Sequence, residues 1–224
     1  MCGIFGFVSL DGRGPSIPRL QKIAAITERR GRHAFGLAWI EDGKIEEYKR
    51  PGAATDDLTD LEFCRGSQVV IGHCRYATHG CPEDNRNNHP HHAGRGVYVH
   101  NGVVLNHERM RDRYNLEPSS ECDSEVLGLV MGRVAGSIGR RALVTARMAQ
   151  GNLAMLGIWT NPLRLLFVRH GNPMHWSQTE RGFYFASLAP ELPGTVRQVP
   201  DGYVGVLEKN GLGLELDYHD WIDR

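Results

Sequence analysis

The sequence lacks an excess of charge of either sign, a long apolar run and any closely paired cysteines. Its 26 basic residues balance 26 acidic ones, which argues against a nucleic-acid partner, because nucleic-acid-binding surfaces are normally basic. No apolar run approaches the roughly 20 residues that a membrane-spanning helix needs. The N-terminus also lacks the basic and apolar segments of a signal peptide. These absences predict a protein with neither a nucleic-acid nor a membrane partner.

The five cysteines are odd in number and widely scattered, and no C-x-x-C pair occurs. This spacing predicts neither a disulfide framework nor a zinc ribbon. A reducing compartment suits such a chain, so we expect a cytoplasmic location. At 224 residues, without an internal repeat or linker, we expect a single domain spanning residues 1–224.

Hydrophobic periodicity places strands at both ends of the chain and helices in its middle. Helices are expected from Pro18, over 56–64, over 106–114, from Asp123 and over 139–148, and strands over 4–8, 35–40, 44–49, 68–74, 97–100, 103–105, 152–159, 163–169, 183–187, 196–199, 203–208 and 212–216. Because these elements do not alternate as βαβ units, they predict an α+β fold with a sheet packed on helices.

The first candidate for chemistry is Cys2. Initiator methionines are commonly removed before a small residue, and removal would leave Cys2 with a thiol and a free α-amine. An α-amine has a pKa of about 7.7–8.0, so a useful fraction is neutral at physiological pH and can act as general base for the thiol. Alternatively, Met-Cys is incidental and residues 4–8 form an ordinary edge strand.

A cysteine that attacks a carboxamide needs hydrogen-bond donors for the oxyanion that forms. Asn101-Gly102 offers a side-chain amide and a backbone N–H. The alternative interpretation is a type I′ turn between two short strands, for which Asn-Gly is a strong signal.

An amino-acid substrate also presents a carboxylate and an ammonium. The planar guanidinium of Arg75 matches two carboxylate oxygens, and Thr78 and His79 follow it at loop spacing. Asp123 is a candidate for the ammonium. It is equally well placed as the N-cap of a helix, and the two roles can coexist.

Eleven histidines are many for this length, and His89-Pro90-His91-His92 resembles a metal-binding tract. However, the helical H-E-x-x-H form is absent, and Pro90 prevents a regular helix across these residues. We therefore expect no metal and no cofactor. His33, His170, His175 and His219 are expected to be surface or packing residues.

Five short motifs follow one another along the chain: Met1-Cys2-Gly3-Ile4, residues 72–80, Asn88-His89-Pro90-His91, His100-Asn101-Gly102-Val103 and Asp123-Ser124-Glu125-Val126. Phe185-Ala186-Ser187 extends the pattern more weakly. In this order the motifs resemble those of the class II glutamine amidotransferases, and the resemblance is greatest to the glutaminase domain of glucosamine-phosphate synthase (glutamine–fructose-phosphate aminotransferase).

The resemblance implies an N-terminal-nucleophile hydrolase fold, a four-layer α/β/β/α sandwich of two antiparallel sheets. It implies that Cys2 is the nucleophile and that Asn101 and Gly102 form the oxyanion hole. It further implies that Arg75, with Thr78 and His79, holds the α-carboxylate of glutamine and that Asp123 holds the α-ammonium. Tyr76 stands where the aminotransferase has tryptophan and would line the exit for ammonia.

Two residues depart from the family pattern, in which both positions are commonly aspartate: His33 after the first helix and Leu188 after Ser187. The change at position 33 could alter the support around Cys2 or communication with a partner.

The resemblance predicts a glutaminase that forms a γ-glutamyl thioester on Cys2. Because the chain ends at Arg224, we expect a separate synthetase or transferase protein to accept the ammonia. Two alternatives stay open: a hydrolase of another γ-glutamyl amide or peptide, and a non-catalytic regulatory module with an amidotransferase-like fold.

Overall fold

Two antiparallel sheets form the centre of the molecule. The structure is a computed structural model that describes residues 1–209 and 214–220. The first sheet has the order β11-β9-β10-β1-β4-β2-β3, and the second has the order β13-β12-β8-β7-β6-β5. The strands of the first sheet are β1 (Gly3–Ser9), β2 (Ala34–Glu41), β3 (Lys44–Pro51), β4 (Val69–Arg75), β9 (His175–Gln178), β10 (Gly182–Ala186) and β11 (Val196–Gln198). Those of the second are β5 (His91–Ala93), β6 (Gly96–Gly102), β7 (Leu153–Trp159), β8 (Arg164–His170), β12 (Tyr203–Lys209) and β13 (Leu214–Asp220).

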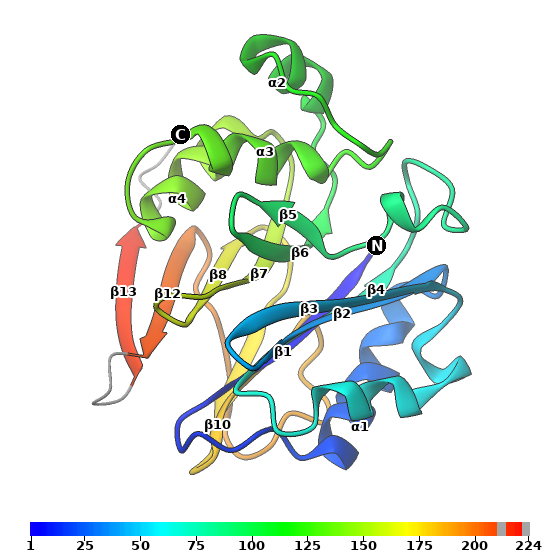
Figure 1. The fold of residues 1–224 in the computed structure, drawn as a ribbon, viewed down its shortest axis with the longest axis vertical. Coiled ribbons are helices and arrows are strands. Elements are labelled where there is room, and N and C mark those ends of the chain that lie inside the picture. Colours follow the sequence, from blue (N-terminus) through cyan, green and yellow to red (C-terminus); the bar gives the residue numbers. More distant parts are fainter. Residues whose placement is uncertain (210–213, 221–224) are drawn as a thin grey trace.

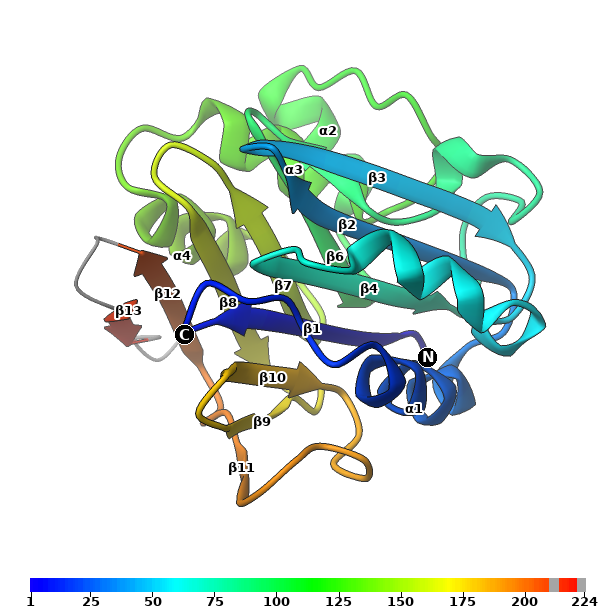
Figure 2. The ribbon, with the colours of Figure 1, turned by 60° about the horizontal axis from the view of Figure 1, so that its bottom comes forward.

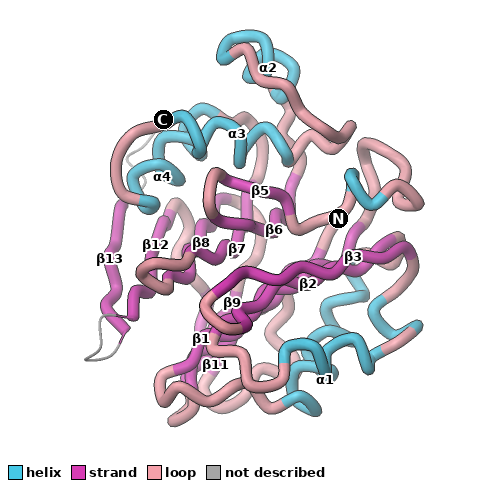
Figure 3. Tube along the Cα trace, in the orientation of Figure 1, coloured by secondary structure: helices cyan, strands magenta, loops and turns pink. Residues whose placement is uncertain are grey.

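Helices cover the outer face of each sheet (Figures 1 and 3). Helix α1 (Ile17–Thr27) packs on the first sheet together with short 3₁₀ turns over Glu28–Arg30, Ala54–Asp56 and Leu58–Cys64, and a further turn spans Asn85–Asn87. The second sheet is covered by α3 (Glu125–Arg133) and α4 (Ile138–Met148), and α2 (His107–Tyr114) packs against α3. The predicted four-layer sandwich of class α+β is confirmed.

Strand β1 shows why the layers stack in this way. All seven of its residues are buried, and its side chains alternate between two cores, as a strand requires. Phe5 and Phe7 face the core under α1, whereas Ile4 and Val8 face the core between the two sheets. A strand that is apolar on both faces takes a central position between β4 and β10 (Figure 2).

Most expected elements are present within a residue or two of their predicted ends, but three predictions need correction and two strands were not expected. Residues 97–105 do not form a hairpin, because β6 runs straight through Asn101 to Gly102 and pairs with β7. Asp123 is not an N-cap, since α3 begins at Glu125 after Ser124. The helix expected over 56–64 is 3₁₀. The short strands β5 and β9 were not expected.

Asn210-Gly211 predicts a further turn, but this pair and the first two residues of the strand expected over 212–216 lie outside the described residues. None of the helices that the structure describes is both long and apolar enough to cross a membrane.

Candidate active site

Cys2 and Asn101 meet in one pocket, where the start of β1 in the first sheet lies near the end of β6 in the second. The pocket has a volume of about 380 Å³. Its lining comprises Met1, Cys2, Tyr76, Thr78, Asn101, Gly102, Val103, Leu105, Gly151, Asn152 and Asn172. Five of the eight predicted site residues are therefore in this lining. Arg75, His79 and Asp123 are not.

The backbone around Cys2 is tied to the rest of the fold at three points. Arg30 donates a hydrogen bond from Nε to the carbonyl of Cys2 at 2.7 Å. The Ile4 N–H donates to Ser187 Oγ at 3.0 Å, and the Ser187 N–H donates to the carbonyl of Ile4 at 2.8 Å. Gly3 lies so close to Thr27 that a Cβ would stand 2.6 Å from the Thr27 carbonyl. Residue 2 is therefore held in a defined place.

The Cys2 thiol is not activated by its surroundings alone. Burial raises its pKa above the ordinary value, and the carboxylate of Asp123 raises it further. The Tyr76 N–H, which donates to Cys2 Sγ at 3.3 Å, the chain's terminal charge and Arg75 only partly oppose this effect on the pKa. The thiol therefore stays protonated near neutral pH, and a nucleophile at this place needs a base.

Asn101 contributes an unpaired amide to the pocket. The residue is fully buried, and neither Nδ2 nor Oδ1 has a hydrogen-bond partner among the residues that the structure describes. Its backbone carbonyl, in contrast, accepts a hydrogen bond from Asn172 Nδ2 at 2.7 Å. Because an unpaired buried polar group costs about 1–3 kcal/mol, this amide is suited to a ligand that supplies the missing partner.

Close packing, and not a turn conformation, requires a glycine at position 102. A Cβ here would lie 2.0 Å from the carbonyl oxygen of Asn152, so that no larger residue fits against the start of β7. The backbone at this position belongs to β6 and pairs with Leu153.

Arg75 holds the loop that carries the predicted carboxylate ligands. Its guanidinium donates to Asn88 Oδ1 at 2.7 Å and to the carbonyl oxygens of His79 and Gly80. The side chain is buried, and its observed partners come from the protein. A direct contact with a substrate carboxylate remains a prediction.

Asp123 and His79 are brought together at the same end of the molecule. Asp123 Oδ2 accepts a hydrogen bond from the Val104 N–H at 2.6 Å, and its Oδ1 lies 3.4 Å from His79 Nδ1. That nitrogen also lies 3.2 Å from Thr78 Oγ1. The aspartate thus fixes the chain after β6 and places a buried carboxylate close enough to affect the Cys2 pKa.

Sequence reasoning missed Arg30, Asn152 and Asn172, which support the pocket. Asn172 belongs to a Gly-Asn-Pro segment, which by itself indicates only a turn. His33 is a packing residue, as expected, but in a specific place: its ring stacks on Tyr76 at 4.9 Å, and its Nδ1 accepts the Ala77 N–H at 3.0 Å.

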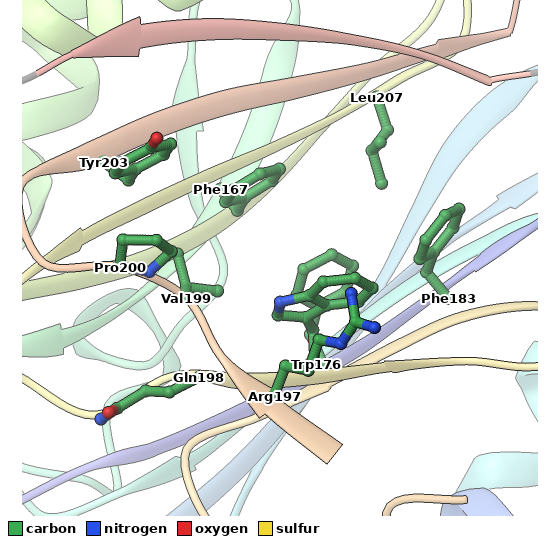
Figure 4. A pocket seen from close by; sticks show the side chains of 10 residues that line it. Phe167, Trp176, Phe183, Arg197, Gln198, Val199, Pro200, Tyr203 and Leu207 are labelled. Carbon is green, nitrogen blue, oxygen red and sulfur yellow. The ribbon is translucent and has the colours of Figure 1, made fainter. Parts of the chain in front are cut away.

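A second pocket, of about 370 Å³, lies between the two sheets at β8–β12 and offers no comparable chemistry (Figure 4). Its described lining is mainly aromatic and aliphatic, and Arg197 lies over the ring of Trp176 at 5.5 Å. No cysteine, histidine or carboxylate is among these lining residues.

A sandwich of two antiparallel sheets between helical layers, with a cysteine at the start of a central strand, defines an N-terminal-nucleophile hydrolase fold. Solved structures agree with this assignment. Glutamine phosphoribosylpyrophosphate amidotransferase from B. subtilis superimposes with a TM-score of 0.80 at 20% identity, over 100% of this chain and 50% of that chain. A glutamine aminotransferase class-II domain protein from Silicibacter pomeroyi has a TM-score of 0.61 at 15% identity, over 99% and 100% of the two chains.

The sequence comparison adds the family. The chain matches no family model, but it is 32% identical over 96% of its length to glutamine–fructose-6-phosphate aminotransferase from Symbiobacterium thermophilum, and 32% identical over 86% to that from Aquifex aeolicus. It spans only about a third of these relatives, 36% and 33% of their lengths. The chain belongs to the class II glutamine amidotransferase family.

Proposed function

We propose that this chain hydrolyses the side-chain amide of glutamine, with Cys2 as nucleophile, and releases ammonia for transfer to an acceptor. The single observation that carries this proposal is that the Cys2 thiol and the unpaired amide of Asn101 line the same pocket. The thiol can act as a nucleophile once a base removes its proton, and the amide N–H groups can donate hydrogen bonds to the oxyanion that forms.

The base in this scheme is the α-amine of Cys2, exposed when Met1 is removed. Met1 lies at the pocket but is 68% exposed, so that an aminopeptidase can reach it. The neutral amine takes the thiol proton, and sulfur attacks the amide carbon of glutamine, forming a C–S bond. The oxyanion then accepts hydrogen bonds from Asn101 Nδ2 and the Gly102 N–H.

The tetrahedral intermediate collapses by breaking its C–N bond. The amine of Cys2, now protonated, returns the proton to the leaving group, and ammonia departs. A water molecule next attacks the γ-glutamyl thioester, its proton passes to the same amine, and glutamate leaves as the thiol is restored. No cofactor enters this balance.

The ends of the substrate are assigned to Arg75 and Asp123. The α-carboxylate would meet the guanidinium of Arg75 with help from Thr78 and His79, and the α-ammonium would meet Asp123. This assignment is supported by the buried Asp123 carboxylate, which accepts one close backbone hydrogen bond through Oδ2 and faces His79 through Oδ1. Tyr76 would line the exit for ammonia.

We infer that a separate synthetase or transferase protein docks over this pocket and consumes the ammonia. Of the three large apolar side chains that stay exposed in the described part of the chain once Met1 is removed, two line the pocket: Tyr76 and Leu105. Exposed apolar groups that gather at one place mark interaction sites.

The test uses the full chain, with removal of Met1 verified by intact mass. We expect glutamine turnover, labelling of Cys2 by a glutamine-mimicking electrophile, and loss of both in Cys2→Ala. Cys81→Ala, which removes an exposed cysteine outside the pocket lining, is the matched control and keeps both. A processed chain that leaves glutamine untouched but cleaves γ-glutamyl peptides would favour the alternative hydrolase. Retention of Met1 in active protein would overturn the scheme.

A further inference from the structure

Three potential metal ligands converge in the interior, outside the pocket lining. They are His89, His91 and Cys122, whose ligand atoms all lie within 4.8 Å of one another. Each residue is at most 6% exposed. Two imidazoles and a thiol are the ligand types that zinc prefers.

The two imidazoles lack partners that a buried ring requires. Neither Nδ1 nor Nε2 of His89 has a hydrogen-bond partner among the residues that the structure describes, and neither does Nε2 of His91. The rings meet edge to face, with their centroids 4.5 Å apart. Because unpaired buried polar groups are costly, these nitrogens are the strongest indication that something binds between them.

Tertiary packing brings Cys122 to the two histidines. His91 opens β5 and pairs with Tyr98 of β6. The Tyr98 hydroxyl donates to the Ser124 carbonyl at 2.6 Å and accepts the Gly128 N–H at 3.0 Å. These bonds hold the start of α3 against the short β5–β6 ladder, and the segment before α3 carries Cys122 into place.

The protonation states suit metal binding once the thiol is deprotonated. Burial lowers the pKa of both histidines well below the ordinary value, which leaves neutral imidazoles with free lone pairs. Burial and Asp123 raise the pKa of Cys122 to about 12, so that a cation has to displace the thiol proton. The charged groups acting on this cluster are the cations of Lys49 and Arg75 and the carboxylate of Asp123.

We propose that His89, His91 and Cys122 bind one Zn²⁺ ion, with water as the fourth ligand. Zinc lies about 2.0–2.1 Å from nitrogen and 2.3 Å from sulfur in tetrahedral sites, so the ligand atoms draw together by about 1 Å on binding. The thiol becomes a thiolate, one proton is released to solvent for each ion bound, and no electron is transferred. This site departs from the expectation of no metal, because a bend that leads into β5, and not a helix, brings His89 beside His91.

The ion would join two segments that reach the active site. Asn88, next to His89, holds Arg75, and Asp123, next to Cys122, holds the chain after β6. The binding claim itself does not rest on the proposed glutaminase activity, since none of the three ligands lines the catalytic pocket.

The experiment is a titration of the full reduced chain with Co²⁺ in the Cys2→Ala background, so that the catalytic thiol cannot contribute. We expect one ion per chain, a cobalt–thiolate absorption band that Zn²⁺ abolishes by displacement, and release of one proton. Adding Cys122→Ser should remove the band and weaken binding more than ~100-fold, because even changes outside the ligand set cost 10–100-fold. The exposed cysteine variant Cys81→Ser should leave both unchanged.

Folding of the variants is checked by circular dichroism and by thermal unfolding with and without Zn²⁺. Zinc should raise the unfolding temperature of the Cys2→Ala and Cys81→Ser proteins and not those of Cys122→Ser or His91→Gln. Absence of stoichiometric binding, or a thiolate band that survives Cys122→Ser, would overturn the site. Because these readouts do not measure glutamine turnover, failure here and failure of the proposed function are distinguishable.

Discussion

The side-chain amide of Asn101 is fully buried in the pocket that it shares with the Cys2 thiol, and both of its polar atoms lack partners in the described structure. A side chain that served only stability would be paired in such a place, since buried amides normally form hydrogen bonds. We therefore expect a substitution at Asn101 to lower catalytic activity with little effect on the free energy of unfolding.

Asn101→Ala should lower kcat for glutamine hydrolysis by ~10²–10³, the usual cost of losing an oxyanion donor. KM should change little, because the donor acts on charge that forms only in the transition state. The free energy of unfolding, measured in urea, should change by no more than about 1 kcal/mol, since no side-chain hydrogen bond is lost. Equal turnover of glutamine by Asn101→Ala and by the unsubstituted protein would contradict the role of Asn101 as an oxyanion donor.

At the scale of elements, α3 lies directly on β5 and shows how close packing overrides helix propensity. A Cβ added at Gly128 would stand 2.0 Å from the His92 carbonyl oxygen and 2.5 Å from the Tyr98 ring. At Gly132, one turn later, the nearest atom would be 3.6 Å away, an ordinary contact.

Gly128→Ala should destabilise the protein by about 1–3 kcal/mol through overpacking, although alanine is the better helix former by about 1 kcal/mol. Gly132→Ala, on the same helix without the clash, should be neutral or stabilising. Urea unfolding of the two variants measures the sign and size of each change in the free energy of unfolding. A Gly128→Ala protein as stable as Gly132→Ala would show that α3 does not rest on β5.

Four buried histidines, on β4, on β6, and at and just before the start of β5, make the stability of the protein depend on pH. Burial lowers the pKa of His73 to about 3 and of His100 to about 4, and it lowers those of His89 and His91 as well. Unfolding restores values near 6.5. The unfolded state therefore binds more protons below pH 6.5, and stability is lost as pH falls from there towards 4.

With a chelator present, the free energy of unfolding should fall by up to about 1.4 kcal/mol per pH unit for each such histidine between pH 6.5 and 4.5. His100→Gln should reduce this slope by about one histidine's share, whatever its effect on stability at pH 7. A slope that is the same in His100→Gln as in the unsubstituted protein would refute the attribution.

At the scale of the whole molecule, the N-terminal strand is joined to a segment that lies 183 residues later. Ser187 Oγ accepts the buried Ile4 N–H, and this bond fixes the strand that carries Cys2. Ser177, on β9 of the same sheet, is also fully buried, but its Oγ has no partner among the described residues.

Ser187→Ala should cost about 1–3 kcal/mol, because it leaves a buried backbone N–H unpaired, and it should lower glutamine turnover by displacing Cys2. Ser177→Ala removes an unpaired hydroxyl and should be neutral or stabilising. Urea unfolding together with initial rates compares the two. If Ser187→Ala and Ser177→Ala changed the free energy of unfolding and the initial rate equally, the Ile4–Ser187 hydrogen bond would not be what holds Cys2 in place.

The elements of this fold could be predicted where one face of the chain is consistently apolar. Strand β1, with Phe5 and Phe7 on one side and Ile4 and Val8 on the other, is visible from alternation alone. Asn101-Gly102 misled the same reasoning, since Asn-Gly is a local signal for a turn. Pairing with β7 and the narrow space beside Asn152 keep these residues in an extended strand.

The sequence by itself determined the α+β class, the scattered cysteines and the motifs that make Cys2, Asn101 and Asp123 candidate site residues, because these depend on residue type and short-range spacing. Only the tertiary structure decided that Cys2 shares a pocket with an unpaired amide and that Cys122 lies beside His89 and His91. Such proximities join residues far apart in the chain, and they arise from the pairing of strands and the packing of α3, which no local pattern encodes.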